Sequence, residues 1–471
     1  MTIQDISRPD ILRTTRAESL RGLCGGAVHL PGDPGFDRAR MPWNVAVDQR
    51  PAAVAFPANA VHTAELVRAA AAAGLRLAPQ STGHNAGALG RLDDVVVVRT
   101  SAMTEVSIDP VRRVARVGGG VVWSPVVQAA AAQGCAVLHG SSPDVGVAGY
   151  SLGGGIGWYA RKLGLQTNNI TGLEVVTADG SIRWADATQN TELFWALRGG
   201  GGSFGIVTAI EFRIFPFQSA VGGMLVWDRT ETERVLRRWV DWTADAPDEV
   251  TTSFRVLNLP PIPDIPEAFR GRNLVVIDGA VLASDDGSAK ILAALRDLRP
   301  EIDTFARVPA ASLVRLHMDP EGPTPGVSNT AMLAGIPDSA IDAFVAQSGP
   351  DSHSSLLMSE LRQLGGALGR PHPGAGALPM LNGAFMSFAA AIAATPEMGA
   401  VGQADADAFT AALAPFASGS QYLNFVEHAV DPSVGYDPVA WGRLVTIKSA
   451  FDPDGLIVGN HLVRRTFEIE D

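Results

Sequence analysis

The chain has 471 residues, of which 46% are hydrophobic and 18% charged, and a formal net charge of -12. This length exceeds one ordinary compact core and the composition is that of a folded protein, so we expect two domains. The negative balance, without any run of basic residues, argues against a nucleic-acid partner.

The first half of the chain alternates strand and helix patterns. Strands are predicted at residues 52–56, 95–98, 113–117 and 136–138, and helices at 63–73 and 125–133. The first helix should end at Gly74, because glycine takes the left-handed conformation that terminates helices. Residues 173–184 are predicted to form a hairpin with its turn at 178–180. A helix at 192–198 and a strand at 206–215 follow.

After Pro216 the pattern changes. Strands are predicted at residues 224–227, 253–257 and 273–282, and helices at 230–244 and 288–298. We interpret this region as a second α+β domain, an antiparallel sheet with helices on one face.

The C-terminal part returns to helix and loop. Asp437 is a typical N-cap residue and Pro438 suits the first helical position, so a helix is predicted from there towards Phe451. The expected organisation is a first domain at residues 1–217, a second at 218–420, and a segment at 421–471 that packs back on the first.

Targeting signals and metal motifs are not expected. Residues 1–23 carry scattered charges and no apolar stretch, and no apolar run reaches the roughly 18 residues that span a bilayer. Cys24 and Cys135 form neither a disulfide framework nor a C-x-x-C metal motif. We therefore expect a soluble cytoplasmic protein with no membrane partner and no metal. The oligomeric state cannot be predicted from the sequence.

Two glycine-rich loops are the most informative feature. Residues 80–87 read QSTGHNAG, and residues 141–157 read SSPDVGVAGYSLGGGIG. Glycines let backbone N–H groups approach phosphate oxygens, so the two loops together predict a site for a long diphosphate ligand. The Rossmann fingerprint does not fit residues 153–157, because no acidic ribose-binding residue lies at the right distance. Ordinary glycine turns of an α/β domain remain the alternative.

The motif Ser81-Thr82-Gly83-His84 resembles the R-S-G-G-H motif of the berberine-bridge-enzyme-like FAD oxidases. Segments 143–157, 199–208, 422–424 and 452–460 resemble later landmarks of that family. The resemblance implies the two-domain α+β fold of vanillyl-alcohol oxidase. It implies an FAD-binding domain of the PCMH type, with its core at about 46–217, and a separate substrate domain.

The resemblance also implies that His84 is bonded covalently to the C8 methyl group of the flavin, although an ordinary loop histidine remains the alternative. Many relatives carry a second link through a cysteine, where this chain has Ser142. Serine cannot form a thioether, and Cys135 lies too early in the chain, so one link is expected. Val145 occupies the position that gates oxygen in the family, and valine there resembles the oxidases, although a core valine would look the same.

The remaining positions that the resemblance places at FAD lie in the same segments. They are Ser81, Thr82, Gly83, Asn85, Gly87, Ser142, Val145, Gly146, Gly149, Gly153, Gly154, Gly157, Gly205, Val207, Asn424 and Asn460.

The catalytic base is not evident. Phe425 stands where several family oxidases have a tyrosine, and Asn382 where others have a glutamate. Tyr422 is the leading substitute, because strand alternation would place it on the same face as Asn424. Tyr150, beside the second loop, is the next candidate. Further candidates without a spacing argument are Glu360, His353 and His428, and Gln363 lies in a segment that resembles the back of the family's substrate site.

The resemblance implies an FAD-dependent oxidase that takes a hydride from an alcohol or amine carbon of a natural-product or sugar-like small molecule. O2 would reoxidise the flavin and yield H2O2. The absence of both family bases keeps open a redox-neutral cyclase, isomerase or dehydratase of secondary metabolism. A non-catalytic flavoprotein that binds a small ligand is a further alternative. The sequence does not identify the substrate.

Overall fold

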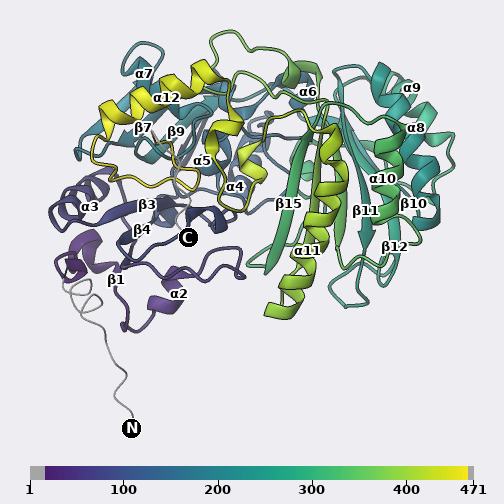
Figure 1. Ribbon diagram of the computed structural model, residues 1–471. Helices are drawn as coiled ribbons and strands as arrows, with labels where there is room; N and C mark the ends of the chain where they lie inside the picture. The colour runs from purple at the N-terminus through teal and green to yellow at the C-terminus, as the bar shows by residue number, and fades with distance from the viewer. Residues whose placement is uncertain (1–15, 465–471) are drawn as a thin grey trace.

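A computed structural model describes residues 16–464 of the chain (Figure 1). Three β-sheets form its framework, two from the first half of the chain and one from the second. Most of the segment 1–23 and the last seven residues of the predicted C-terminal segment lie outside the described residues.

The first sheet has four strands in the order β1-β2-β4-β3. They are β1 (Val28–His29), β2 (Ala53–Ala55), β4 (Val95–Arg99) and β3 (Arg76–Gln80). β2 and β3 both pair with β4 in parallel, and α3 (Ala60–Ala72) provides the crossover between them. The side chain of Asn59 caps α3 by accepting a hydrogen bond from His62 N at 3.0 Å, so the helix begins three residues before its predicted start. Gly74 follows its end with φ +65°, as expected.

The second sheet is antiparallel and has five strands in the order β5-β6-β9-β7-β8. They are β5 (Val106–Asp109), β6 (Val114–Gly118), β9 (Ile206–Arg213), β7 (Ile170–Val176) and β8 (Ile182–Asp186). The predicted hairpin is confirmed, with Val176 opposite Ile182. The strand predicted at 136–138 is wrong, because only Ala136 of this segment forms a bridge, and its partner Phe215 lies beyond the end of β9.

Further helices lie between consecutive strands of these two sheets along the chain, and α12 lies beside the sheets (Figure 1). They are α2 (Phe36–Arg40), α4 (Trp123–Ala132), α5 (Val147–Leu152), α6 (Ala160–Leu163) and α7 (Thr191–Leu197), with α12 at Pro438–Phe451. Asp437 caps α12, accepting hydrogen bonds from the N–H groups of Val439 and Ala440 at 3.0 Å each. Beyond this helix, Ile457 pairs in parallel with Leu77 of β3.

The third sheet follows the order β13-β10-β12-β11-β16-β17-β15, with β14 also paired to β10. Its strands are β10 (Ser219–Asp228), β11 (Val250–Asn258), β12 (Asn273–Val281), β13 (Ile302–Asp303), β14 (Ala306–Pro309), β15 (Gly326–Leu333), β16 (Met358–Gln363) and β17 (Phe385–Ile392). All its pairings are antiparallel, as predicted. Four helices share a hydrophobic core with one face of this sheet: α8 (Thr232–Asp245), α9 (Asp285–Arg296), α10 (Asp338–Ser348) and α11 (Pro396–Leu413).

Side chains along each strand of the third sheet alternate between its helix-covered face and the opposite face. On β11, Phe254 and Val256 point into the helix-covered core, so Ser253 and Arg255 lie on the opposite face. That polar face is directed towards the first half of the molecule, where it meets the second glycine loop.

A second predicted strand is also wrong. Residues 422–424 do not form a strand, because the chain turns there: residues 423–425 form a 3-10 helix, and Phe425 N donates to Tyr422 O at 3.0 Å.

Candidate cofactor and substrate site

The two glycine loops lie against each other. The first follows β3, and the second leads into α5. A Cβ atom on Gly146 would lie 2.6 Å from Ser81 Oγ, so only glycine permits this approach. In the first loop, Gly83 has φ +87°, and a Cβ atom there would lie 2.7 Å from Pro42 Cβ.

His84 lies between an indole ring and a carboxylate. The ring of Trp43 stacks on its imidazole with centroids 4.0 Å apart and an interplanar angle of 16°. Its Nδ1 atom lies 2.7 Å from Thr82 Oγ1, and its Nε2 atom lies 3.5 Å from Asp144 Oδ1. The ring is therefore held on one face and has a polar neighbour at each nitrogen.

Asp144 is itself anchored by three donors. Ser142 Oγ donates to its Oδ1 at 2.8 Å, while Trp43 Nε1 and Gly322 N donate to Oδ2 at 2.6 and 2.8 Å. Burial alone would raise the pKa of Asp144, but the nearby His84 imidazole and these three hydrogen bonds outweigh it and hold the pKa well below its usual range. Asp144 is thus a fixed carboxylate beside His84.

The loops carry buried polar atoms that no protein group of the described residues satisfies. These are Ser81 Oγ, His84 Nε2, Asn85 Oδ1, Tyr150 Oη and Ser151 Oγ. Such atoms are uncommon in native proteins and call for a ligand or water partner. Gly149, in the same region, would present a Cβ atom to open space, with no atom within 4 Å. Polar atoms and glycines of this kind fit the hydroxyl and phosphate groups of FAD.

Residues 422–424 close the site from the C-terminal part of the chain. Asn424 Nδ2 donates to Tyr150 O at 3.0 Å, and a Cβ atom on Gly153 would lie 1.9 Å from Asn424 Oδ1. Asn85 Nδ2 donates to Leu423 O at 3.3 Å, so this segment contacts both loops.

Other predicted positions occupy the same region. Gly87 packs against Glu427 O, Gly154 against the Tyr422 ring and Gly157 against His139 O. Val145 packs partly buried against the core of the second sheet, and its carbonyl accepts a hydrogen bond from Trp123 N at 3.0 Å.

Three predicted positions lie further along the chain. Gly205 and Val207, at the start of β9, contact β7, where Val207 is opposite Val175. Asn460 lies in the segment that packs on Ser203, whose hydroxyl donates to His461 O at 3.4 Å.

Tyr422 and Tyr150 differ in their hydrogen bonding. The hydroxyl oxygen of Tyr422 accepts hydrogen bonds from Gly155 N at 2.6 Å and from Asn424 Nδ2 at 3.2 Å. The Tyr150 hydroxyl has no hydrogen-bond partner within residues 16–464. Burial raises the pKa of both tyrosines, that of Tyr150 well above its ordinary value. A base role for either tyrosine stays a prediction.

A buried charge cluster on the polar face of the third sheet was not predicted as a group. Its strand residues are neighbours in register: Arg255 lies opposite Glu360, and Ser253 lies opposite both Arg362 and Asp278. Asp278 Oδ2 accepts hydrogen bonds from Arg255 Nη2 at 2.5 Å and from His317 at 2.8 Å.

His317 connects this acid to a second ion pair. Its Nε2 atom lies 3.4 Å from Glu360 Oε1 and 3.3 Å from Arg362 Nη2. Arg362 Nε donates to Glu360 Oε1 at 2.8 Å, whereas Glu360 Oε2 is buried and has no hydrogen-bond partner in the described part of the chain. Burial would lower the pKa of Arg362, but Glu360 and other nearby carboxylates outweigh it and raise that pKa.

The charge cluster meets the second glycine loop at a small cavity of about 20 Å³. The cavity is lined by Ser141, Ile156, Gly157, Trp158, Thr251, Thr252, Ser253, Glu360, Arg362 and Gln363. Arg362 also lies over the Phe425 ring, 4.9 Å from its centroid, and Trp158 contacts His317. Residues from both halves of the chain therefore line one cavity together with Glu360.

The other positions considered from the sequence are not at this cavity. His353 and His428 are exposed. Asn382 accepts a hydrogen bond from Ser420 Oγ at its carbonyl oxygen. Arg255, Asp278 and His317 were missed, and the available signal was the single aspartate inside the apolar run of β12.

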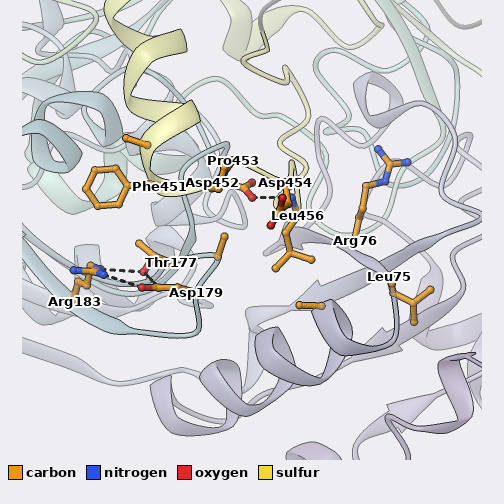
Figure 2. Close-up of a pocket in the computed structure, with 14 residues that line it drawn as sticks. Leu75, Arg76, Thr177, Asp179, Arg183, Phe451, Asp452, Pro453, Asp454 and Leu456 are labelled. Atoms are coloured by element: carbon orange, nitrogen blue, oxygen red, sulfur yellow. Dashed lines mark hydrogen bonds and ion pairs between the residues drawn. The ribbon is translucent and has the colours of Figure 1, made fainter.

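A cavity of about 650 Å³ lies elsewhere, between the end of α3, the β7–β8 turn and the end of α12 (Figure 2). Figure 2 shows Arg183 directed at Asp179 and Thr177, and Asp452 turned back on its own segment. Because these charged groups are already paired within the protein, the cavity offers no comparable set of unpartnered polar atoms.

Among the described helices, none is both long and apolar enough to cross a membrane.

Residues 51–186 match the family described as FAD binding domain. The chain is 35% identical over 209 residues to (R)-6-hydroxynicotine oxidase of Paenarthrobacter nicotinovorans, covering 44% of this chain and 46% of that protein. It is 34% identical over 220 residues to glucooligosaccharide oxidase of Sarocladium strictum, covering 45% and 44%. These matches span about half the length of the curated relatives.

Solved structures of other proteins superpose on this structure over most of the chain. A 6-hydroxy-D-nicotine oxidase from Arthrobacter nicotinovorans superposes with a TM-score of 0.78 at 25% identity, covering 93% of this chain and 98% of that one. A BBE-like 1 protein of Physcomitrella patens gives 0.83 at 21% identity, covering 97% and 100%. The chain carries an FAD-binding domain and has the two-domain fold of the vanillyl-alcohol-oxidase group. The resemblance predicted from its motifs is confirmed.

Proposed function

We propose that the protein is an FAD-dependent oxidase that takes a hydride from an alcohol or amine carbon of a small molecule. FAD supplies the two-electron acceptor, at flavin N5, and O2 reoxidises it with release of H2O2. The observation that carries the proposal is the convergence of both glycine loops and residues 422–424 around unpartnered buried polar atoms. The similar curated proteins named above, both of them oxidases, support it.

The cofactor is held by His84 through one covalent bond. A glucooligosaccharide oxidase is described as carrying a 6-S-cysteinyl, 8α-N1-histidyl FAD. This chain has a histidine in the matching motif and Ser142 at the family's cysteine position, where no thioether can form. Its FAD therefore keeps the histidyl bond alone.

The substrate proton is accepted at Glu360 Oε2. The neighbouring Arg362 donates to Oε1, which leaves Oε2 as the free acceptor at the small cavity. His317 and Asp278, behind this pair, keep its orientation. Tyr422 is a poorer acceptor at neutral pH, because its oxygen already accepts two hydrogen bonds and its pKa is raised.

The free acceptor also constrains the substrate. A buried carboxylate oxygen needs a donor, so the reacting substrate group carries a hydroxyl or an amine N–H. Trp158 and Phe425 flank the charge cluster with aromatic surface that can contact the carbon skeleton of the ligand.

To test the proposal, the FAD-loaded protein is mixed anaerobically with each member of a panel of small alcohols and amines. The flavin absorbance is then followed over time. Bleaching by a substrate, followed by recolouring and stoichiometric H2O2 on admission of air, is the expected result. A protein that converts a ligand without bleaching would instead be the redox-neutral alternative. A protein that binds ligands and converts none would be the non-catalytic one.

A further inference from the structure

We infer that Asp144 is a positioning residue that prepares His84 for its covalent bond to FAD. It does so by holding the proton on Nε2, which leaves Nδ1 as the nucleophile. The inference rests on the proposed function, since it concerns the bond proposed there at His84. It adds a positioning residue and a reason for the serine at position 142.

The loop geometry brings Asp144 to His84. The second loop touches the first where Gly146 meets Ser81, and Asp144 lies two residues before that contact. Its Oδ1 atom then lies 3.5 Å from His84 Nε2. This separation is longer than a mature hydrogen bond, as is common in catalytic contacts before the ligand is bound.

The carboxylate has little freedom to turn away. Oδ2 accepts from Trp43 Nε1 and from Gly322 N, and Oδ1 accepts from Ser142 Oγ. Oδ1 also faces His84, whose buried Nε2 atom lies 3.5 Å away and has no hydrogen-bond partner among the described residues. Ser142, which cannot form a thioether, thus orients the acid beside the remaining covalent link.

The two ring nitrogens of His84 have different neighbours. A neutral imidazole carries one proton, and a carboxylate can only accept hydrogen bonds, so the nitrogen that faces Asp144 carries the proton. Nδ1 then presents its lone pair, to which the Thr82 hydroxyl donates at 2.7 Å. The stacked Trp43 ring prevents the imidazole from turning over and exchanging the two nitrogens.

Formation of the bond between His84 and the flavin is an oxidation by two electrons, and O2, the oxidant proposed above, accepts them in the end. A C–H bond of the C8 methyl group breaks, the Nδ1–carbon bond forms, and the imidazolium so produced loses its Nε2 proton. The flavin ring keeps the two electrons and gains two protons, and O2 then accepts both as H2O2. The carboxylate of Asp144 stabilises the positive charge that develops on the ring during this attack.

The experiment uses the full-length chain purified free of flavin from riboflavin-starved cells. FAD is added in air, samples are denatured in acid over time, and the fraction of flavin that precipitates with the polypeptide is measured. The variants are Asp144→Asn, Asp144→Glu and, as the matched control, Asp179→Asn. Asp179 is also an aspartate with several hydrogen bonds, but it lies in the β7–β8 turn.

Wild type and Asp179→Asn are expected to link FAD at the same rate, and Asp144→Asn at least tenfold more slowly. Asp144→Glu should regain part of the rate, because it restores the carboxylate. Reversible FAD binding by Asp144→Asn should stay within a few fold of wild type, which a folding defect would not allow. In 15N spectra of flavin-free protein labelled at histidine, His84 should show the Nε2–H tautomer in wild type and a mixture in Asp144→Asn.

Three results would overturn the inference. Asp144→Asn could link FAD at the wild-type rate, or Asp144→Glu could behave as Asp144→Asn does. Wild-type protein could also bind FAD and release all of it in acid. That result would contradict both the inference and the proposed covalent bond, but not the proposed FAD-dependent oxidation. Failure of folded wild type to bind FAD at all would contradict the proposed function itself.

Discussion

Glu360 and Arg362 lie two residues apart on β16, and their side chains meet on the polar face of the third sheet, where Arg362 Nε donates to Glu360 Oε1 at 2.8 Å. The period of two along a strand places both on this face. The pairing leaves Glu360 Oε2 as a buried acceptor with no hydrogen-bond partner among the described residues, and Glu360 lines the cavity between the two halves of the chain.

Replacing Glu360 by glutamine should lower turnover by about 100-fold or more, since positioned proton acceptors contribute roughly 10²–10⁴ in rate. The variant keeps the volume of the side chain and removes the carboxylate. Anaerobic flavin reduction and peroxide release measure the effect. Glu192→Gln, at an exposed ion pair with Arg443, is the control and should match wild type. An unchanged rate of flavin reduction in Glu360→Gln would exclude Glu360 as the acceptor.

Replacing Tyr422 by phenylalanine should mainly reduce stability. The change leaves the Gly155 N–H buried without its acceptor, which costs about 1–3 kcal/mol in the free energy of unfolding. Denaturant unfolding and steady-state turnover, measured on the same preparation, separate the two roles. If turnover collapsed while the unfolding midpoint stayed at the wild-type value, Tyr422 would be the base predicted from the sequence.

Glu427 should make stability depend on pH. Burial raises the pKa of this carboxyl to about 7, opposed by a hydrogen bond from Ser328 Oγ at 2.9 Å. A carboxyl whose pKa is higher in the folded state binds its proton more tightly there. Its contribution to the free energy of unfolding is therefore present at low pH and is lost between about pH 4.5 and 7.

Glu427→Gln removes this dependence, because the amide does not titrate. Relative to wild type, the variant should gain up to about 3 kcal/mol on going from pH 4.5 to pH 7.5. Denaturant titrations of both proteins across this range provide the comparison. A difference between them that does not change with pH would show that Glu427 has an ordinary pKa.

The sequence correctly predicted those elements whose ends are set by capping and turn residues next to them in the chain. Asp437-Pro438 marks the start of α12 through its cap, and the turn at 178–180 marks the β7–β8 hairpin. The first glycine loop was recognisable because its motif is contiguous. The end of α3 was predicted at Gly74, whereas its start depends on Asn59, a cap that was not considered.

The missed features depend on register and on contacts between distant segments. Arg255, Asp278 and Glu360 come from three strands, and only the pairing of those strands places them together. Trp43 reaches His84 from 41 residues earlier, and Gly322 reaches Asp144 from 178 residues later. The strand predicted at residues 422–424 failed because alternation was assumed for a segment that turns.

We propose above that this chain binds FAD and holds it through His84. To test this, the full chain is purified and precipitated in acid, and the flavin is located by peptide mapping of the pellet. We expect yellow protein with one flavin on the peptide that contains His84, none on the peptide that contains Ser142, and complete release of flavin from His84→Ala. Flavin recovered wholly in the supernatant of the wild-type protein would contradict the covalent bond, and folded protein without flavin would contradict the claim as a whole.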